Sequence, residues 1–132
     1  MEIQNDLVNH PQHYTSENIV VNKTYEPIDF CKLFGFELGN AFKYLFRRKH
    51  KGTELQDLKK AEFYLLKALG DDYEDTSIIL DRVMERLMRD EYFAEFFSLW
   101  SEKDFLRKFT LSMAGVREVL AFTRDEIVKL ES

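Results

Sequence analysis

The sequence predicts an all-α fold, and three observations carry that prediction. Only 2 prolines and 5 glycines interrupt 132 residues, of which 45% are hydrophobic. Apolar side chains recur at helical spacing from residue 27 to the C-terminal end. Polar capping residues precede several of these periodic stretches. We therefore expect an N-terminal extended arm packed on an antiparallel helical hairpin, followed by C-terminal helices.

The first element in chain order is the arm. Residues 1–26 contain repeated asparagines and one short apolar run at 19–21, and they show no helical period. Pro27 then suits the first position of a helix, where its missing N–H would be unpaired in any case. Gly35 ends this short helix, whose apolar side consists of Ile28, Phe30, Cys31 and Phe34.

The hairpin is predicted from two amphipathic stretches, residues 37–50 and 54–69. Gly52 is a natural stop for the first helix, and Thr53 with Gln56 matches a capping box that starts the second. A connection of about three residues makes the two helices antiparallel neighbours. The expected buried stripes are Leu38, Ala41, Phe42 and Leu45 in the first helix, and Leu55, Leu58, Ala61, Leu65 and Leu69 in the second.

Residues 71–132 are predicted to form a helical C-terminal extension to the first unit, residues 1–70. An acidic cluster at 71–75 suits a helix N-terminus. An apolar stripe at 78–88 and an aromatic run at 92–100 follow. Ser101 with Asp104 resembles a cap for a helix over 105–113, and Thr123 with Glu126 resembles the start of a last short helix. The apolar stripes are wide, so this half either packs on another subunit in a homo-oligomer or completes one compact bundle.

Charge and cysteine content narrow the function classes. The net charge is −5, with 10 basic and 9 acidic residues up to Gly70 and 9 basic and 15 acidic residues after it. This balance argues against a general polyanion binder. A single cysteine excludes an internal disulfide and fits a reducing compartment. With neither a membrane span nor a signal peptide in the sequence, we expect a cytoplasmic protein without a membrane partner.

The most informative pattern is the polar side of the hairpin. Cations repeat along one side of the first helix, and Tyr and Asn residues accompany them. Across the turn, a carboxylate, a cation and a tyrosine could face them. Cations held near hydroxyls are suited to a phosphate or nucleotide site. The alternative is a solvated charged surface. The residues are Asn40, Lys43, Tyr44, Arg47 and Lys51, opposite Asp57, Lys60 and Tyr64.

Other candidate sites are weaker. The basic run at 47–51 resembles a nucleic-acid patch, but the pI near 5.3 makes nucleic acid an improbable partner. His10 and His13 lack further ligands at metal-site spacing, so no structural metal is expected. His13 and Tyr14 could instead close over the cations, or simply anchor the arm. Cys31 lies on an apolar helix side, as a structural thiol would. No P-loop or dinucleotide-binding glycine pattern is present.

Several segments together resemble a small phage protein family catalogued as a domain of unknown function. Its pattern is HPxHY, an acidic helix start, GNxxKYxxR, KG and DLxKAxxYL, and the resemblance covers residues 8–69. Here the pattern corresponds to residues 10–14, 26–29, 39–47, 51–52 and 57–65. The link between Tyr14 and Glu26 is longer than the pattern has. The family includes coliphage nucleotide kinases without a P-loop.

This resemblance implies a phage-type nucleotide-binding protein, most concretely a nucleoside monophosphate kinase with ATP as phosphate donor. The magnesium requirement stays open. The alternative is a non-catalytic protein that sequesters a nucleotide or binds a host protein. Location would be the cytoplasm of the infected cell. The implied catalytic residues are His13, Asp57 and Lys60, and the implied phosphate or nucleotide ligands are Tyr14, Asn40, Lys43, Tyr44, Arg47, Lys51 and Tyr64.

Overall fold

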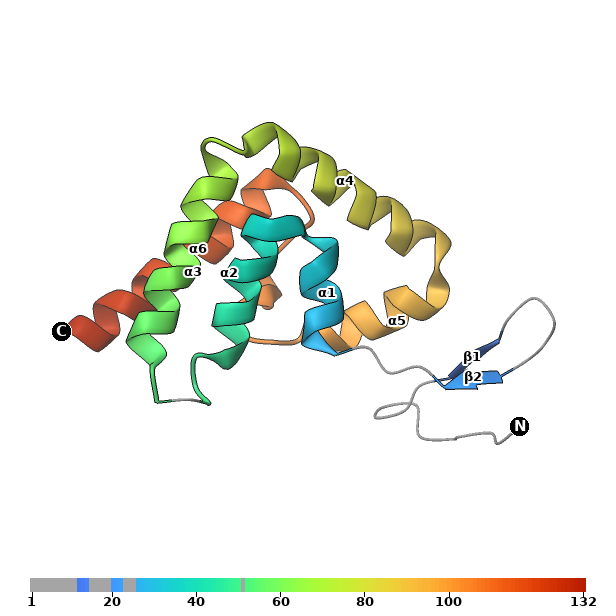
Figure 1. The fold of residues 1–132 in the computed structure, drawn as a ribbon, viewed down its shortest axis with the longest axis horizontal. Coiled ribbons are helices and arrows are strands. Elements are labelled where there is room, and N and C mark those ends of the chain that lie inside the picture. Colours follow the sequence, from blue (N-terminus) through green and yellow to red (C-terminus); the bar gives the residue numbers. More distant parts are fainter. Residues whose placement is uncertain (1–11, 15–19, 23–25, 51) are drawn as a thin grey trace.

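A computed structural model describes residues 12–14, 20–22, 26–50 and 52–132 of the chain. Apart from two short strands, the described residues form helices and their connections, and the predicted all-α fold is confirmed (Figure 1). The helices are α1 (Pro27–Leu33), α2 (Gly35–Arg47), α3 (Glu54–Leu69), α4 (Tyr73–Arg89), α5 (Glu91–Trp100) and α6 (Met113–Glu131), with a 3₁₀ turn η1 (Leu106–Lys108) between α5 and α6.

Two short strands precede the helices. Strand β1 (Gln12–Tyr14) pairs antiparallel with β2 (Val20–Asn22), so that His13 lies opposite Val21. The predicted arm is thus extended at these positions. Its expected packing on the helical hairpin lies outside the described residues.

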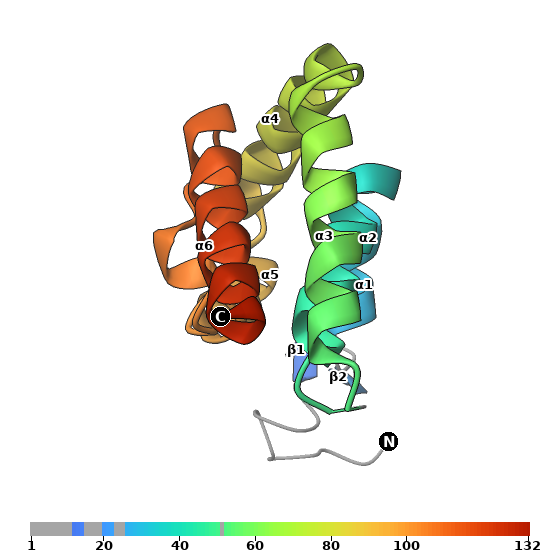
Figure 2. The ribbon, with the colours of Figure 1, turned by 90° about the vertical axis from the view of Figure 1, so that its left-hand side faces the viewer.

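The helices form two layers that α4 joins (Figure 2). One layer holds α1, α2 and α3, with α2 in contact with both neighbours. The other holds α6 with η1, and α6 packs along α3. This arrangement buries the apolar sides of the hairpin and leaves its opposite, polar side at the surface.

Helix α1 starts and ends as its sequence predicts. Pro27 occupies the first position, and Glu26 and Asp29 form a reciprocal capping box. Gly39 explains how closely α1 approaches α2: a Cβ atom there would collide with the carbonyl oxygen of Cys31. Only glycine allows the two backbones to meet at this point.

The hairpin also forms as predicted, with one correction at its turn. Leu38, Phe42, Leu58 and Leu65 are among the most buried side chains of the protein. Gly52 adopts a φ of 69°, the left-handed conformation that favours glycine at a turn. The predicted capping box at Thr53 and Gln56 is wrong. The Thr53 hydroxyl donates to Asp57 Oδ2 at 3.1 Å, so it caps no backbone N–H.

Aromatic contacts join the C-terminal helices to the first layer in one continuous hydrophobic core. The extension beyond Gly70 therefore covers the apolar side of the hairpin. The ring centroids are 4.5 Å apart for Phe30 and Trp100, 5.8 Å for Phe34 and Phe109, and 5.9 Å for Phe42 and Phe105.

Two predicted helix starts in this half are wrong. No regular α-helix covers 105–113, because the Asp104 carboxylate binds Arg48, the residue that follows α2, and Ser101 ends α5. Helix α6 begins at Met113, where the Ser112 hydroxyl accepts from the N–H of Gly115. Thr123 lies in the middle of α6 and is buried. Its hydroxyl donates to the carbonyl of Val119, which satisfies the polar group inside the helix.

No helix in the described part of the chain combines the length and the apolar character that a membrane crossing requires.

Candidate functional site

The polar side of the hairpin gathers around two stacked tyrosines. The Tyr44 ring of α2 and the Tyr64 ring of α3 have centroids 6.2 Å apart and planes inclined by 7°. They meet because α2 and α3 are antiparallel neighbours, so that Tyr44, three residues before the end of α2, faces Tyr64 in the third turn of α3. The pair forms a platform at the surface of the hairpin, within the range of favourable ring contacts.

Three cations surround the Tyr44 ring. Lys43 Nζ lies 4.8 Å from the ring centroid, Lys60 Nζ lies 5.2 Å away, and the Arg47 guanidinium carbon lies 5.5 Å away. All three distances fall within the range in which a cation is attracted to an aromatic face. The ring therefore offsets part of the repulsion among three like charges. We call these three cations and the two tyrosines the cationic face.

A buried carboxylate supports the cationic face from below. Asp57 is only 1% exposed, and its Oδ2 lies 3.4 Å from Arg47 Nε. The only hydrogen bond that this carboxylate accepts from a described residue is the one from Thr53. Arg47 itself is 40% exposed on its side chain, so its terminal nitrogens reach the surface while its Nε stays near Asp57. Asp57 thus orients Arg47 and is itself shielded from solvent.

Asn40 lies one turn before Tyr44 and is partly exposed. Its Nδ2 donates to the carbonyl oxygen of Phe36 at 2.8 Å. Asn40 and Lys43 also line a groove of about 470 Å³ between α1 and α2, together with Phe36 and Cys31. The groove is mostly apolar and opens beside the cationic face, which gives the site a recess next to its charges.

Sequence reasoning missed two exposed aromatic residues at the edge of this site. Phe36 is 68% exposed and meets the Tyr64 ring edge-on, with centroids 5.8 Å apart. Phe63 is 55% exposed and lies 5.3 Å from the same ring. A signal was present in the sequence, since Phe36 precedes Asn40 by four residues and so shares its polar helix side.

Three predicted site residues are not placed. The side chains of His13 and Tyr14 and the whole of Lys51 lie outside the described residues. The structure therefore brings together Asn40, Lys43, Tyr44, Arg47, Asp57, Lys60 and Tyr64, which are the site residues predicted on the two hairpin helices.

The basic run at the end of α2 is not one continuous surface. Arg48 is 3% exposed, and its guanidinium donates to the carbonyl of Leu45 at 2.7 Å and to Asp104 at 2.6 Å. Its cation also lies 5.3 Å from the Phe122 ring of α6. Arg48 is thereby committed to joining α2 to the C-terminal half, and Arg47 and Lys49 are left on separate sides of it.

The Cys31 thiol is unsuited to act as a nucleophile. It is buried between α1 and α2, and burial raises its pKa from 9.0 to about 12, although nearby Lys43 opposes the shift. A thiol with this pKa stays protonated at neutral pH, and the thiolate is the reactive form. Among the described residues, no group of three His, Cys, Asp or Glu side chains is placed to hold a metal ion.

Comparison with known proteins adds a family but no described activity. Residues 8–66, less than half of the chain, match the model of a family described as protein of unknown function (DUF3310). Neither the curated proteins nor the solved structures gave a match. The match covers α1, α2 and most of α3, and hence every residue of the cationic face. The match at residues 8–66 confirms the resemblance to a domain of unknown function.

Proposed function

We propose that the cationic face binds the phosphate group of a nucleotide. The observation that carries this proposal is the convergence of Lys43, Arg47 and Lys60 on the Tyr44 ring, because three cations from two helices share one small area. A solvated charged surface would tend to spread like charges apart. Holding them together is favourable when an anion completes the site.

The two lysines and the arginine would contact the phosphate group in different ways. Lys43 and Lys60 supply mobile point charges, and Arg47 supplies a planar fork that can hold two phosphate oxygens. Asp57 fixes the inner edge of the Arg47 guanidinium at 3.4 Å, which orients the outer nitrogens before the ligand arrives. Such preorganisation favours binding, since less freedom is lost when the complex forms.

The apolar groove beside Lys43 is suited to the base or sugar. Its volume of about 470 Å³ lies within the range of small-molecule sites, and Asn40 offers an amide at its rim. The exposed ring of Phe36 borders the same groove and offers a stacking surface. With phosphate over the cationic face, the rest of a nucleoside monophosphate would lie between α1 and α2.

The enzymatic form of this proposal is a nucleoside monophosphate kinase with ATP as donor. Phosphoryl transfer requires positioning and neutralisation of charge more than covalent chemistry, and a helical cationic site can supply both. Lys60 is available at the surface for this role. Asp57 is buried and already accepts a hydrogen bond from Thr53, which favours a positioning role for it. Its burial also supports the second candidate, a protein that binds a nucleotide without turnover.

The test is a panel of nucleoside mono- and triphosphates, scored by thermal shift and by product formation. We expect at least one nucleotide to raise the melting temperature of the wild type in a saturable manner. Lys60→Gln should weaken that response about tenfold, as expected for the loss of one charge-assisted contact worth about 1.4 kcal/mol. Lys59→Gln is the matched control, because Lys59 is paired with Glu131 away from the cationic face.

The outcomes separate the candidates. Stabilisation with turnover supports a kinase, and stabilisation without turnover supports a binder. An equal effect of Lys59→Gln and Lys60→Gln would show that bulk charge is responsible and would refute the site. The same conclusion would follow if no phosphate compound stabilised the protein.

A further inference from the structure

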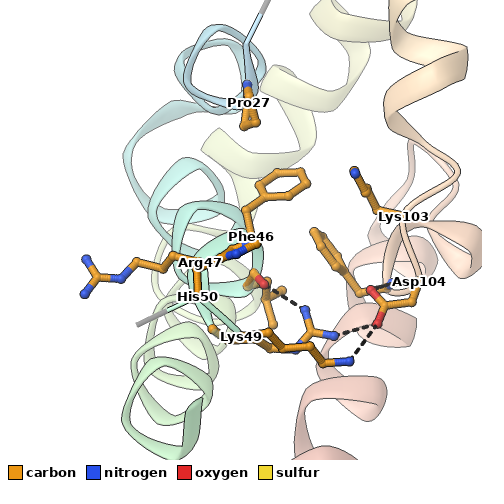
Figure 3. A pocket seen from close by; sticks show the side chains of 10 residues that line it. Pro27, Phe46, Arg47, Lys49, His50, Lys103 and Asp104 are labelled. Carbon is orange, nitrogen blue, oxygen red and sulfur yellow. Dashed lines mark hydrogen bonds and ion pairs between the residues drawn. The ribbon is translucent and has the colours of Figure 1, made fainter. Parts of the chain in front are cut away.

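A second pocket lies at the C-terminal end of α2, away from the cationic face. Its volume is about 530 Å³, and it is formed between the end of α2, the start of α1 and the segment that follows α5 (Figure 3). Arg47 points away from its interior, whereas Phe46, Lys49, Lys103 and Asp104 surround it. We call it the α2-end pocket.

The α2-end pocket combines an apolar lining with an excess of positive charge. Its apolar residues are Pro27, Leu45, Phe46 and Phe105. Its charged side chains, Arg47 apart, are Arg48, Lys49, Lys103 and Asp104, so three cations face one carboxylate. Lys103 takes part in no ion pair with any residue that the structure describes.

Asp104 shows where an anion is held in this pocket. Its Oδ2 accepts from Arg48 at 2.6 Å and lies 3.9 Å from Lys49 Nζ, and its side chain is 52% exposed. The neighbouring Arg48 Nε is buried and makes no hydrogen bond among the described groups. This one carboxylate serves both Arg48 and Lys49, and it leaves the buried Arg48 Nε and the Lys103 ammonium without an anionic partner among the described residues.

We propose that the α2-end pocket binds a small aromatic anion, a flat ring that carries a carboxylate or a phosphate. The anionic group would lie among Arg48, Lys49 and Lys103, beside Asp104. The ring would pack on Phe46, whose own ring is already held by Trp100 at 4.9 Å and Phe105 at 5.0 Å. A rigid aromatic wall next to fixed cations selects a ligand that has both characters.

This pocket cannot be a property of the DUF3310 domain alone. Pro27 and residues 45–50 belong to the matched segment, but Lys103, Asp104 and Phe105 belong to the extension beyond it. The site exists only where the extension folds back on α2, and Arg48 is the residue that ties the two together. It is therefore a feature of this chain and independent of the nucleotide proposal.

The only tryptophan of the chain provides a direct readout. Trp100 is nearly buried behind Phe46, and its Nε1 has no hydrogen-bond partner among the described groups. We would titrate the full-length protein with phenyl phosphate and with benzoate, following Trp100 fluorescence and the heat of binding. Two controls supply one half of the ligand each: inorganic phosphate supplies the anionic group alone, and benzyl alcohol supplies the aromatic ring alone. We expect saturable binding of at least one aromatic anion, with a Kd at least tenfold below that of either half.

Substitutions test whether the aromatic anion binds in the α2-end pocket. Lys103→Glu should raise the Kd of the better probe at least tenfold, because the added carboxylate repels the anion. Lys108→Glu makes the same charge change outside the lining and should leave the Kd within twofold. Lys49→Gln, at the exposed end of α2, should raise the Kd about threefold or more and repeats the test at a second residue. Lys60→Gln on the cationic face should change nothing.

The proposal is overturned if no aromatic anion binds saturably to the wild type. It is equally overturned if inorganic phosphate binds as tightly as phenyl phosphate, since the apolar lining would then contribute nothing. A Kd that responds to Lys60→Gln but not to Lys103→Glu would place the probe on the cationic face, and would also refute it. Failure here leaves the nucleotide proposal intact, because that proposal is tested with the nucleotide panel and with Lys60→Gln, a residue outside the α2-end pocket.

Discussion

Tyr44 is the residue around which the candidate site is built. Lys43, Arg47 and Lys60 all lie within 5.5 Å of its ring centroid, and Tyr64 stacks on it. An aromatic face attracts cations without neutralising them, so the three charges remain available to a ligand. A carboxylate at the same place would have cancelled one of them. Tyr44 therefore holds the three cations together without cancelling their positive charge.

Arg47 and Arg48 show how neighbouring residues of the same type acquire opposite roles. Arg47 points to the polar side of the hairpin and is 40% exposed, with Asp57 behind it. Arg48 points to the core side, where Leu45 and Asp104 accept its hydrogen bonds. Successive residues on a helix are about 100° apart, and the boundary between surface and core happens to pass between these two. From composition alone, both arginines would be expected at the surface.

At the residue scale we predict that the Cys31 thiol is unreactive in the native protein. Burial raises its pKa to about 12, so almost no thiolate exists at pH 8. Ellman's reagent should react with it at least a hundredfold more slowly in buffer than in denaturant, where one thiol per chain should appear. Because the native pKa exceeds the unfolded value of about 9.0, the protonated thiol contributes stability below pH 9 that is lost as the pH rises toward 12.

The control for the predicted pH dependence is a variant that lacks the thiol. Cys31→Ala removes the titrating group, so the alkaline loss of stability between pH 9 and pH 12 should be smaller than in the wild type. Fast labelling of the native wild type at pH 8 would contradict the buried position of this thiol.

At the scale of elements, the hairpin and the first helix depend on two glycines for different reasons. Gly39 lies where α1 crosses α2, and a Cβ there would strike the carbonyl oxygen of Cys31. Gly52 lies in the turn with a φ of 69°, and a Cβ added there would meet nothing within 4 Å. The first is required by a close backbone approach, and the second by backbone conformation.

We predict that Gly39→Ala destabilises the protein more than Gly52→Ala does. Gly39→Ala should lower the free energy of unfolding by about 2–3 kcal/mol, because the helices must separate. Gly52→Ala should cost about 1 kcal/mol, the strain of a left-handed alanine. Urea unfolding at constant pH measures both. Equal costs would mean that α1 can move away from α2 without loss of packing.

Helices that depend on local pattern were predictable, and those that depend on a distant partner were not. Helices α1, α2 and α3 begin and end within two or three residues of their predicted bounds, because proline, glycine and apolar spacing determine them locally. The expected helix at 105–113 failed because Asp104 is bound by Arg48, 56 positions earlier. The expected cap at Thr53 failed for a local reason, because its hydroxyl donates to Asp57, four residues later.

At the scale of the whole molecule, the C-terminal extension completes the hydrophobic core. Trp100, Phe105 and Phe109 contact rings of α1 and α2 that would otherwise be exposed. Residues 1–70 and 71–132 differ in charge, and only the first of them contains the segment that matches the DUF3310 model, yet they share one core. The extension therefore has a structural role in this chain. The expected homo-oligomer stays a prediction, for which light scattering of the full-length protein is the measurement.

We predict that a chain ending at Gly70 does not fold cooperatively. Removing 71–132 would expose Phe30, Phe34 and Phe42, each of which is at most 1% exposed in the full chain. Exposing rings of this size costs about 1.5–3 kcal/mol each, which together approaches the whole stability of a small domain. Circular dichroism on heating should show a broad, non-cooperative change. A sharp transition in the truncated chain would demonstrate an independent domain.

By itself, the sequence determined the all-α fold, the helical hairpin and the polar pattern of its outer side, because these depend on residue spacing within single helices. The tertiary structure decided which of the cations act together. It gathered Lys43, Arg47 and Lys60 on Tyr44, withdrew Arg48 into the core, and exposed Phe36 beside the site. It also created the α2-end pocket, which needs residues from both halves of the chain. The reason is physical, since charge and aromatic contacts depend on distance in space, and sequence spacing sets that distance only within one helix.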